Sequence, residues 1–147
     1  MLERIDDIIW SVRPRSDKIG DLGLRIREYA IPLFESRKIN FNIVIPDSVK
    51  ELKLHMEIRW NVYLIAKEAI NNLIKYSACT HAGIIISYER KRLIMEIDDN
   101  GKGFDQQEPK DRNGIMNMNE RALRINGYLK ITSSPGNGTN VRLEAPC

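Results

Sequence analysis

Residues 68–77, with the sequence EAINNLIKYS, combine an apolar helical stripe with three polar side chains that share one face. They end a longer run of helical apolar periodicity over residues 56–77. At about 100° per residue, Glu68, Asn72 and Lys75 fall within roughly 60° of one another. The apolar stripe lies to one side of them. The pattern therefore predicts one long helix that faces both a core and a site.

The three polar side chains suit a metal ion and a phosphate. Mg²⁺ prefers hard oxygen ligands and keeps several waters, so the Glu68 carboxylate and the Asn72 amide oxygen are candidate ligands. The Lys75 ammonium, close by on the same face, suits a phosphate. An ordinary solvated helix face with an i,i+4 pair would present the same residues. This stretch alone leaves both interpretations open.

Length and composition indicate one globular domain. A chain of 147 residues can bury a core of its own, and 42% hydrophobic with 29% charged residues is ordinary for a globular protein. The net charge of +3 gives little support for a nucleic-acid surface. No apolar run approaches the ~18 residues of a membrane helix, and no signal peptide is visible. Cys79 and Cys147 lack metal-ligand spacing, which predicts free thiols in a reducing compartment.

The first third of the chain predicts helices and one strand. Residues 3–12 predict a short helix ended by Pro14, either the cut end of a longer helix or a terminal helix docked on the domain. Residues 19–38 predict a second helix, which Pro32 should kink or split. Alternation over residues 40–45 predicts a strand that ends in a turn.

The second half predicts two pairs of strands separated by a loop and a helix. The strands cover residues 82–88 and 92–98, then 128–133 and 140–145, and the helix covers residues 115–125. Paired strands of this kind predict an α+β fold, a two-layer sandwich of a mixed β-sheet and α-helices.

Two polar residues fall on the predicted inner face of this sheet. Asp99 continues the apolar phase of the strand that contains Leu93 and Ile97, and Thr139 is in phase with Val141. An unpartnered carboxylate on the buried side would be costly, so Asp99 should have a partner.

Three glycine-containing turns follow the long helix, over residues 100–103, 113–114 and 135–139. Glycine lets backbone N–H groups approach a ligand closely, and the second turn opens a helix whose N-terminus favours an anion. A single turn of this kind would be a weak signal. The ordered series is strong: carboxylate and amide on a helix, then Asp-x-Gly-x-Gly-Phe, then Gly before a helix, then Pro-Gly-x-Gly-Thr.

The ordered motifs resemble those of the ATP-binding catalytic domain of bacterial two-component sensor histidine kinases, in the GHKL superfamily shared with gyrase, Hsp90 and MutL. Residues 68–76 resemble the N box of that family, residues 99–104 its first glycine box, residues 113–121 its second and residues 136–139 its last. Residues 7–14 resemble the end of the family's dimerisation helix pair. The resemblance covers nearly the whole chain and implies the Bergerat fold, with residues 1–14 as dimerisation-helix remnant or linker and residues 15–147 as the catalytic domain.

The resemblance also implies roles for individual residues. Asn72 would bind Mg²⁺, Glu68 would hold or polarise a metal-bound water, and Lys75 would contact phosphate. Asp99 would accept the adenine amino group, assisted through water by Thr139. The remaining expected site residues are Tyr76, where many relatives have His, and three glycines that would shape the pocket and lid: Gly101, Gly103 and Gly114.

Besides Tyr76, two more features depart from the family pattern. The lid, residues 105–113, is short even for the short-lid branch, and it has no apolar anchor, so we expect it to order only with the triphosphate bound. The phosphoacceptor histidine of the family lies on a dimerisation helix, upstream of where this chain starts. His55 and His81 lie outside the motifs, so we expect both to be bystanders.

The sequence thus predicts a histidine kinase catalytic domain that binds ATP and Mg²⁺ and presents the γ-phosphate to a histidine on a dimerisation segment, with a response regulator as a further partner. A serine kinase of the anti-sigma type and a non-catalytic nucleotide-sensing module are the alternatives. We expect a cytoplasmic domain, of a larger membrane sensor, with no nucleic-acid partner and no direct membrane contact.

Overall fold

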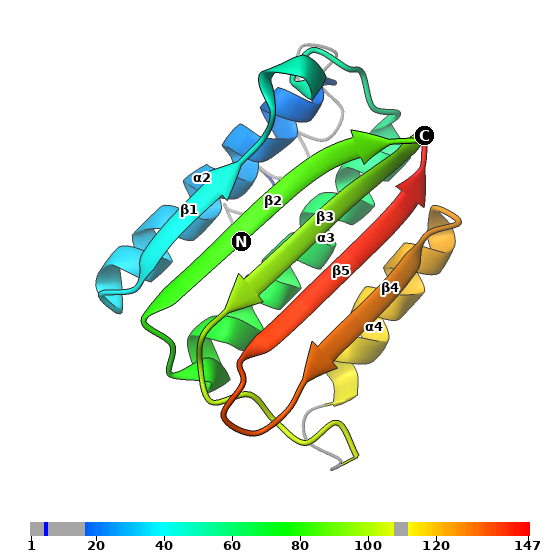
Figure 1. The fold of residues 1–147 in the computed structure, drawn as a ribbon. Coiled ribbons are helices and arrows are strands. Elements are labelled where there is room, and N and C mark those ends of the chain that lie inside the picture. The colour runs from blue at the N-terminus through cyan, green and yellow to red at the C-terminus, as the bar shows by residue number, and fades with distance from the viewer. Residues whose placement is uncertain (1–4, 6–16, 108–111) are drawn as a thin grey trace.

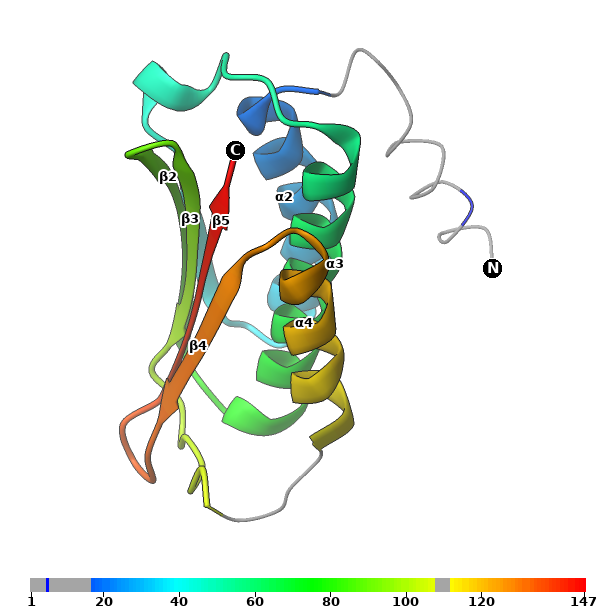
Figure 2. The same cartoon turned by 90° about the vertical axis from the view of Figure 1, so that its right-hand side faces the viewer.

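The chain folds into one sheet with helices over one of its faces (Figures 1 and 2). The structure, a computed structural model, describes residue 5, residues 17–107 and residues 112–147. Figure 2 shows the two layers edge-on, with α2, α3 and α4 on the same side of the strands. The predicted α+β class, with a mixed sheet and a layer of helices, is confirmed.

The described elements alternate between the two layers along the chain. No helix within the described ranges is both long and apolar enough to cross a membrane. In chain order the elements are α2 (Ile19–Ser36), β1 (Asn40–Val44), the 3₁₀ turn η2 (Asp47–Val49), α3 (Met56–Asn72), the π-helical turn η3 (Leu73–Ser77), β2 (His81–Glu89), β3 (Arg92–Asp99), α4 (Arg112–Arg124), β4 (Tyr128–Ser133) and β5 (Thr139–Pro146).

The sheet has the strand order β1-β2-β3-β5-β4. β1 runs parallel to β2, and the other pairs are antiparallel, so the sheet is mixed. The central strand β3 pairs with β2 on one side and β5 on the other, and its last residue, Asp99, lies opposite Thr139 of β5. Two residues from distant motifs therefore meet at one end of the sheet.

The core lies between the sheet and the helices. In β3, Leu93, Met95 and Ile97 are buried, which confirms the predicted phase of this strand. The inner faces of the helices contribute apolar residues at spacings of three and four, as an amphipathic helix requires. In α2 and α3 the buried hydrophobic residues are Ile19, Leu22, Ile26, Ala30, Phe34, Val62, Tyr63, Ile65, Ala66, Ala69 and Ile70.

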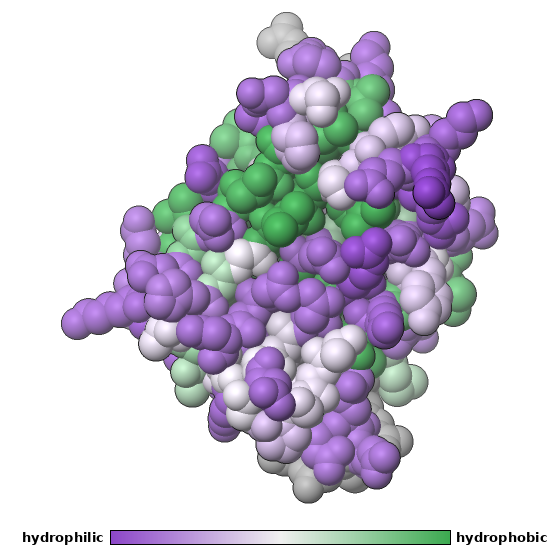
Figure 3. Space-filling view, in the orientation of Figure 1, coloured by the Kyte–Doolittle hydropathy of each residue, from purple (hydrophilic) through white to green (hydrophobic). Residues whose placement is uncertain are grey.

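The other face of the sheet is not covered by the described helices (Figure 3). Arg142 forms ion pairs there with Glu96 and Glu144, each at 3.0 Å. An apolar patch lies nearby, where the exposed side chains of Val44 and Ile85 are register partners on β1 and β2. Cross-strand pairs of this kind stabilise a sheet from its solvent side.

Three predictions about the helices differ from the structure or fall outside its described residues. Pro32 does not split α2: it lies at an exposed position inside one continuous helix, Ile19–Ser36. The helix expected to start at Ile115 begins three residues earlier, at Arg112, so Gly114 lies in its first turn rather than before it. The helix expected over residues 3–12 and the domain boundary at residue 14 fall outside the described residues, apart from residue 5.

Candidate functional site

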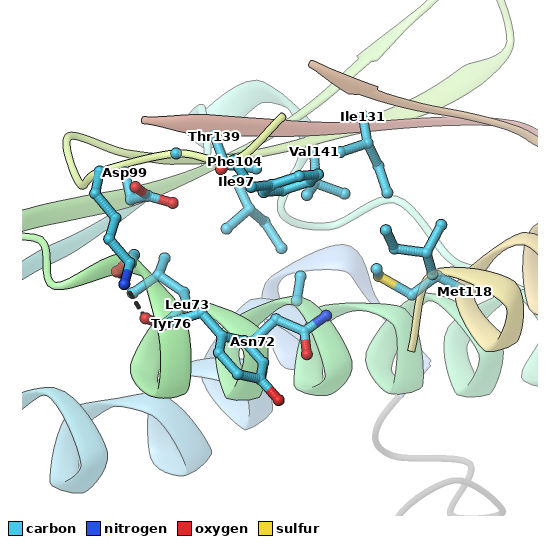
Figure 4. Close-up of a pocket in the computed structure, with 15 residues that line it drawn as sticks. Asn72, Leu73, Tyr76, Ile97, Asp99, Phe104, Met118, Ile131, Thr139 and Val141 are labelled. Atoms are coloured by element: carbon cyan, nitrogen blue, oxygen red, sulfur yellow. Dashed lines mark hydrogen bonds between the residues drawn. The ribbon is translucent and has the colours of Figure 1, made fainter. Parts of the chain in front are cut away.

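A cavity of about 350 Å³ opens between the sheet and the helices α3 and α4 (Figure 4). This volume falls within the range of small-molecule sites. The sheet contributes Asp99 and Thr139, α3 contributes Asn72, and α4 contributes Met118. Four of the motifs predicted from the sequence therefore converge on one space.

Most of the cavity wall is apolar. Figure 4 shows side chains from β3, β4 and β5 facing side chains from α3 and α4 across the open space. A flat aromatic ligand can bury its faces between such walls while polar groups at its edge set its orientation. The apolar lining residues are Ala69, Leu73, Ile97, Phe104, Ile115, Met118, Ile131 and Val141.

Asp99 supplies a half-buried carboxylate at one end of this wall. The backbone N–H of Gly101 donates to Asp99 Oδ1 at 2.8 Å. Burial raises the pKa of Asp99, and backbone hydrogen bonds from Gly101 and Thr139 partly offset this effect. A desolvated carboxylate of this kind is a strong acceptor for an amino group on a ligand.

Asn72 and Glu68 meet α4 at Gly114. A Cβ atom at Gly114 would lie 2.4 Å from Glu68 Oε1 and 3.2 Å from Asn72 Nδ2, so this position has no room for a side chain unless they move. Gly114 is buried in the contact between α3 and α4. The structure thus brings together Glu68, Asn72 and Gly114, although only Asn72 of the three lines the cavity.

The end of α3 departs from the uniform helix that the sequence predicted. Residues Leu73–Ser77 form a π-helical turn, in which hydrogen bonds span five residues rather than four. The spacing of 100° per residue therefore fails beyond Asn72. Tyr76 lines the cavity, whereas Lys75 is exposed and is not among the lining residues.

The loop after β3 is held between two other segments. The Lys102 N–H donates to the Ser77 carbonyl at 2.7 Å, and the Gly136 N–H donates to the Lys102 carbonyl at 2.7 Å. Gly103 has φ +62°, and a Cβ atom there would lie 2.2 Å from the Ser134 carbonyl oxygen. Glycine at this position permits both the left-handed backbone and the close approach of the β4–β5 turn.

Thr139 belongs to a small hydroxyl cluster beside Asp99. Its Oγ1 lies 2.9 Å from Ser133 Oγ, which also donates to the Gly138 carbonyl at 2.9 Å. The Phe104 N–H donates to the same Ser133 hydroxyl at 2.9 Å. This cluster ties the loop after β3 to both strands of the β4–β5 hairpin.

Sequence reasoning missed Lys102, Ser133 and the apolar wall. The position of Lys102 between Gly101 and Gly103, three residues after Asp99, was an available signal for its place at the cavity. Ser133 gave no signal, because its partners come from the loop after β3 and from the start of β5. The wall residues looked like ordinary core, and only the tertiary arrangement leaves a space beside them.

Both histidines lie away from the cavity. His55 is the N-cap of α3, and its Nδ1 accepts a hydrogen bond from the Glu57 N–H at 3.4 Å. His81 starts β2, where its Nδ1 lies 2.8 Å from Thr80 Oγ1. Neither is among the residues that line the cavity.

The profile of one protein family matches residues 59–147, which is more than half of the chain. The family is described as histidine kinase-, DNA gyrase B- and HSP90-like ATPases. The chain belongs to this family. The matched region contains α3 from Arg59 onward and all three glycine-containing turns, so the resemblance stated from the motifs is confirmed.

Related sequences are sensor proteins. This ATPase-family domain is 30% identical over 140 residues to the sensor protein VraS of Staphylococcus haemolyticus and 31% identical to that of Staphylococcus aureus. Each alignment covers 95% of this chain and 39% of the relative. The chain therefore spans about two fifths of the length of these relatives.

Solved structures share the fold. The catalytic domain of histidine kinase ThkA superposes with a TM-score of 0.72 and 11% identity, over 88% of this chain and 93% of that one. A histidine kinase domain from a blue-light-activated kinase of Erythrobacter litoralis gives a TM-score of 0.69 and 15% identity, over 85% and 60%. These similarities support the fold of the ATPase-family domain.

Proposed function

We propose that this domain binds ATP together with Mg²⁺ and presents the γ-phosphate to a histidine on a dimerisation segment of the full-length protein. The observation that carries the proposal is the single cavity that joins the Asp99 carboxylate to the Asn72 amide across apolar walls. The family membership supplies ATP as the ligand, and the sensor relatives favour a histidine kinase over a serine kinase or a non-catalytic sensing module.

The adenine base would lie between the apolar walls, with its amino group donating to Asp99. The burial that raises the pKa of Asp99 supports the assignment. A desolvated carboxylate discriminates strongly between a ligand amino group, which donates to it, and a ligand carbonyl, which cannot. Thr139, opposite Asp99 in the sheet, would assist through a water molecule. Gly101 and Gly103 would shape the turn that carries the acceptor.

The donor set near α4 fits Mg²⁺. Asn72 offers an amide oxygen at the cavity, and the Glu68 carboxylate lies beside it at Gly114. Within the described residues no group of three or more His, Cys, Asp or Glu side chains could hold a metal ion. Mg²⁺ is commonly bound through one or two protein oxygens, nucleotide phosphates and waters, and Asn72 and Glu68 offer such oxygens. When bound, it would neutralise charge on the phosphates.

The remaining site residues would position the phosphates. Asn72 would be the metal ligand, and Glu68 would hold a water bound to the metal. Lys75 and Tyr76 follow within the π turn and would contact the phosphates from the exposed side. In phosphoryl transfer the protein contributes mainly position and charge, which is what these residues would supply.

The partners follow from the same proposal. The acceptor histidine would belong to the dimerisation segment, and a response regulator would receive the phosphoryl group from it. We also propose a cytoplasmic location, since ATP is the substrate and Cys79 and Cys147 are free thiols.

A labelling experiment tests the proposal. With γ-labelled ATP and Mg²⁺ the domain alone should stay unlabelled, because His55 and His81 both lie away from the cavity. Adding a separate helix-pair segment with an acceptor histidine should produce acid-labile label on that segment, and Asn72→Ala should block the reaction. The control is the same segment with its histidine replaced by alanine. Acid-labile phosphate on His55 or His81 would contradict the proposal.

A further inference from the structure

Asn100 lies between the Asp99 carboxylate and the Gly101 N–H that donates to it, yet its side chain points to another part of the molecule. Its Oδ1 accepts hydrogen bonds from the backbone N–H groups of Thr80 and His81, at 2.9 and 3.0 Å. Its Nδ2 donates to Thr80 Oγ1 at 2.9 Å. Nδ2 also lies 3.4 Å from His81 Nδ1. One side chain thus makes four hydrogen-bond contacts with a single dipeptide.

These contacts join the loop after β3 to the connection between α3 and β2. The backbone N–H of Asn100 adds a bond to the His81 carbonyl at 3.2 Å. A second anchor follows two residues later, where the Lys102 N–H donates to the Ser77 carbonyl. The turn that carries the Asp99 carboxylate is therefore fixed on both sides to the segment that ends the long helix.

An amide matches this anchor at both of its ends. Oδ1 accepts from two backbone donors, and Nδ2 faces the Thr80 hydroxyl and the His81 ring nitrogen. An aspartate would keep the acceptor and lose the donor, and an alanine would lose both. Asn100 is exposed and does not line the cavity, so its side chain would not touch a bound nucleotide.

We propose that Asn100 is a positioning residue that sets the place of the Asp99 carboxylate and thereby the preference for adenine. The proposal rests on the proposed role of Asp99. Without the Asn100 side chain, the turn keeps its backbone bonds to His81, Ser77 and Gly136 but loses its side-chain contacts with Thr80 and His81. The carboxylate can then shift away from the position where the amino group of adenine donates to it.

The test compares ATP with inosine triphosphate, which has a carbonyl where adenine has its amino group and cannot donate to Asp99. Titration calorimetry on the whole chain gives the ratio of the two affinities. Asn100→Ala should lower this ratio by about fivefold to tenfold, the effect of one weakened hydrogen bond. The affinity for inosine triphosphate should change little. Asn100→Asp, which keeps the two bonds from the backbone and loses the two contacts made by Nδ2, should lower the ratio by less.

Asn40→Ala is the matched control. Asn40 Nδ2 lies 3.3 Å from His81 Nε2, so this variant perturbs the same cluster from its far side. Its ATP to inosine triphosphate ratio should equal that of the wild type. Equal losses of affinity for both nucleotides in Asn100→Ala would show a general structural role and overturn the proposal, as would an unchanged ratio. Should the alanine variant fail to fold, an unchanged ratio in Asn100→Asp would also overturn it.

Asp99→Asn separates this inference from the proposed function. If Asp99→Asn leaves the nucleotide ratio at its wild-type value, the assignment of Asp99 to the adenine amino group fails. If Asp99→Asn removes the preference and Asn100→Ala does not, only the positioning role of Asn100 fails.

Discussion

The two ends of the cavity are built by different means. At the Asp99 end, backbone and hydroxyl hydrogen bonds join the loop after β3 to Ser77 and to the β4–β5 hairpin. At the other end, Glu68 and Asn72 meet Gly114 by close packing between two helices. A hydrogen-bonded turn fixes the direction of an acceptor, whereas a packed helix contact fixes the distance between the groups on the two helices. The first end suits the recognition of a base and the second suits groups that change during transfer.

Asp99→Asn should have the largest effect, because it removes the charged acceptor at the hydrogen-bonded end. We expect ATP affinity to fall by at least about a hundredfold, since a site built around a buried hydrogen bond strongly rejects a mismatched partner. The fold should survive, as judged by circular dichroism. Titration calorimetry measures the loss, and wild-type protein should bind ATP and ADP but not GTP. Similar affinities for ATP and GTP would refute the role of Asp99.

Asn72→Ala should affect the packed end alone. ADP binding without metal should stay nearly unchanged, while the gain in ATP affinity on adding Mg²⁺ should disappear because the amide ligand is missing. We expect this gain to be about tenfold in the wild type, near the worth of a charge-assisted contact. Calorimetry with and without Mg²⁺ checks it. If Mg²⁺ strengthens ATP binding equally in both proteins, Asn72 is not a ligand.

Gly114→Ala should also perturb the packed end, with a smaller effect. The added methyl group would displace the Glu68 carboxylate and lower the rate of transfer to an acceptor segment severalfold, with ADP affinity retained. Adding Glu68→Asp, which shortens the side chain, should recover part of the loss. Gly20→Ala, in the first turn of α2, is the control, because its Cβ would lie 3.1 Å from the Lys50 carbonyl, remote from the cavity. Strictly additive effects of the two substitutions at 68 and 114 would argue against direct contact.

The pH dependence of stability should show the smallest effect. Burial raises the pKa of Asp99 above its usual 3.8, so the folded protein holds this proton more tightly than the unfolded chain. The resulting stabilisation is complete below the unfolded pKa and is lost as pH rises through the raised pKa. The free energy of unfolding of wild type and Asp99→Asn, measured with denaturant across this acidic range, should show wild type losing stability relative to the variant as pH rises. Parallel pH profiles of the unfolding free energy in the two proteins would contradict the raised pKa of Asp99.

The Asp99 end of the cavity could be predicted from the sequence because the alternation that indicates it is local. The alternation through β3 placed Asp99 on the buried face, and the structure puts it there. The lid was less predictable: residues 112 and 113 belong to α4, and residues 108–111 lie outside the described part of the chain. The Asn113-Gly114 pair has the composition of a turn, but the contact with Glu68 requires a residue without a side chain inside the helix.

Other features depend on tertiary structure and could not be found from local patterns. The apolar wall combines residues of three strands and two helices. The predicted position of Lys75 assumed a helix with constant spacing. No residue type between Leu73 and Ser77 indicates a π turn. Pro32 was expected to kink or split α2, yet α2 is a single helix that contains it at an exposed position.

The π turn has a further consequence for how this domain tolerates insertions and deletions. A π turn holds one residue more than an α-turn, and such turns are less favourable than regular helix. Deleting one residue between Leu73 and Ser77 would regularise the helix, but it would also withdraw the carbonyl that accepts from Lys102. Selection for thermal stability and selection for nucleotide binding would then act on this single residue in opposite directions, as is common where a functional site uses unfavourable backbone.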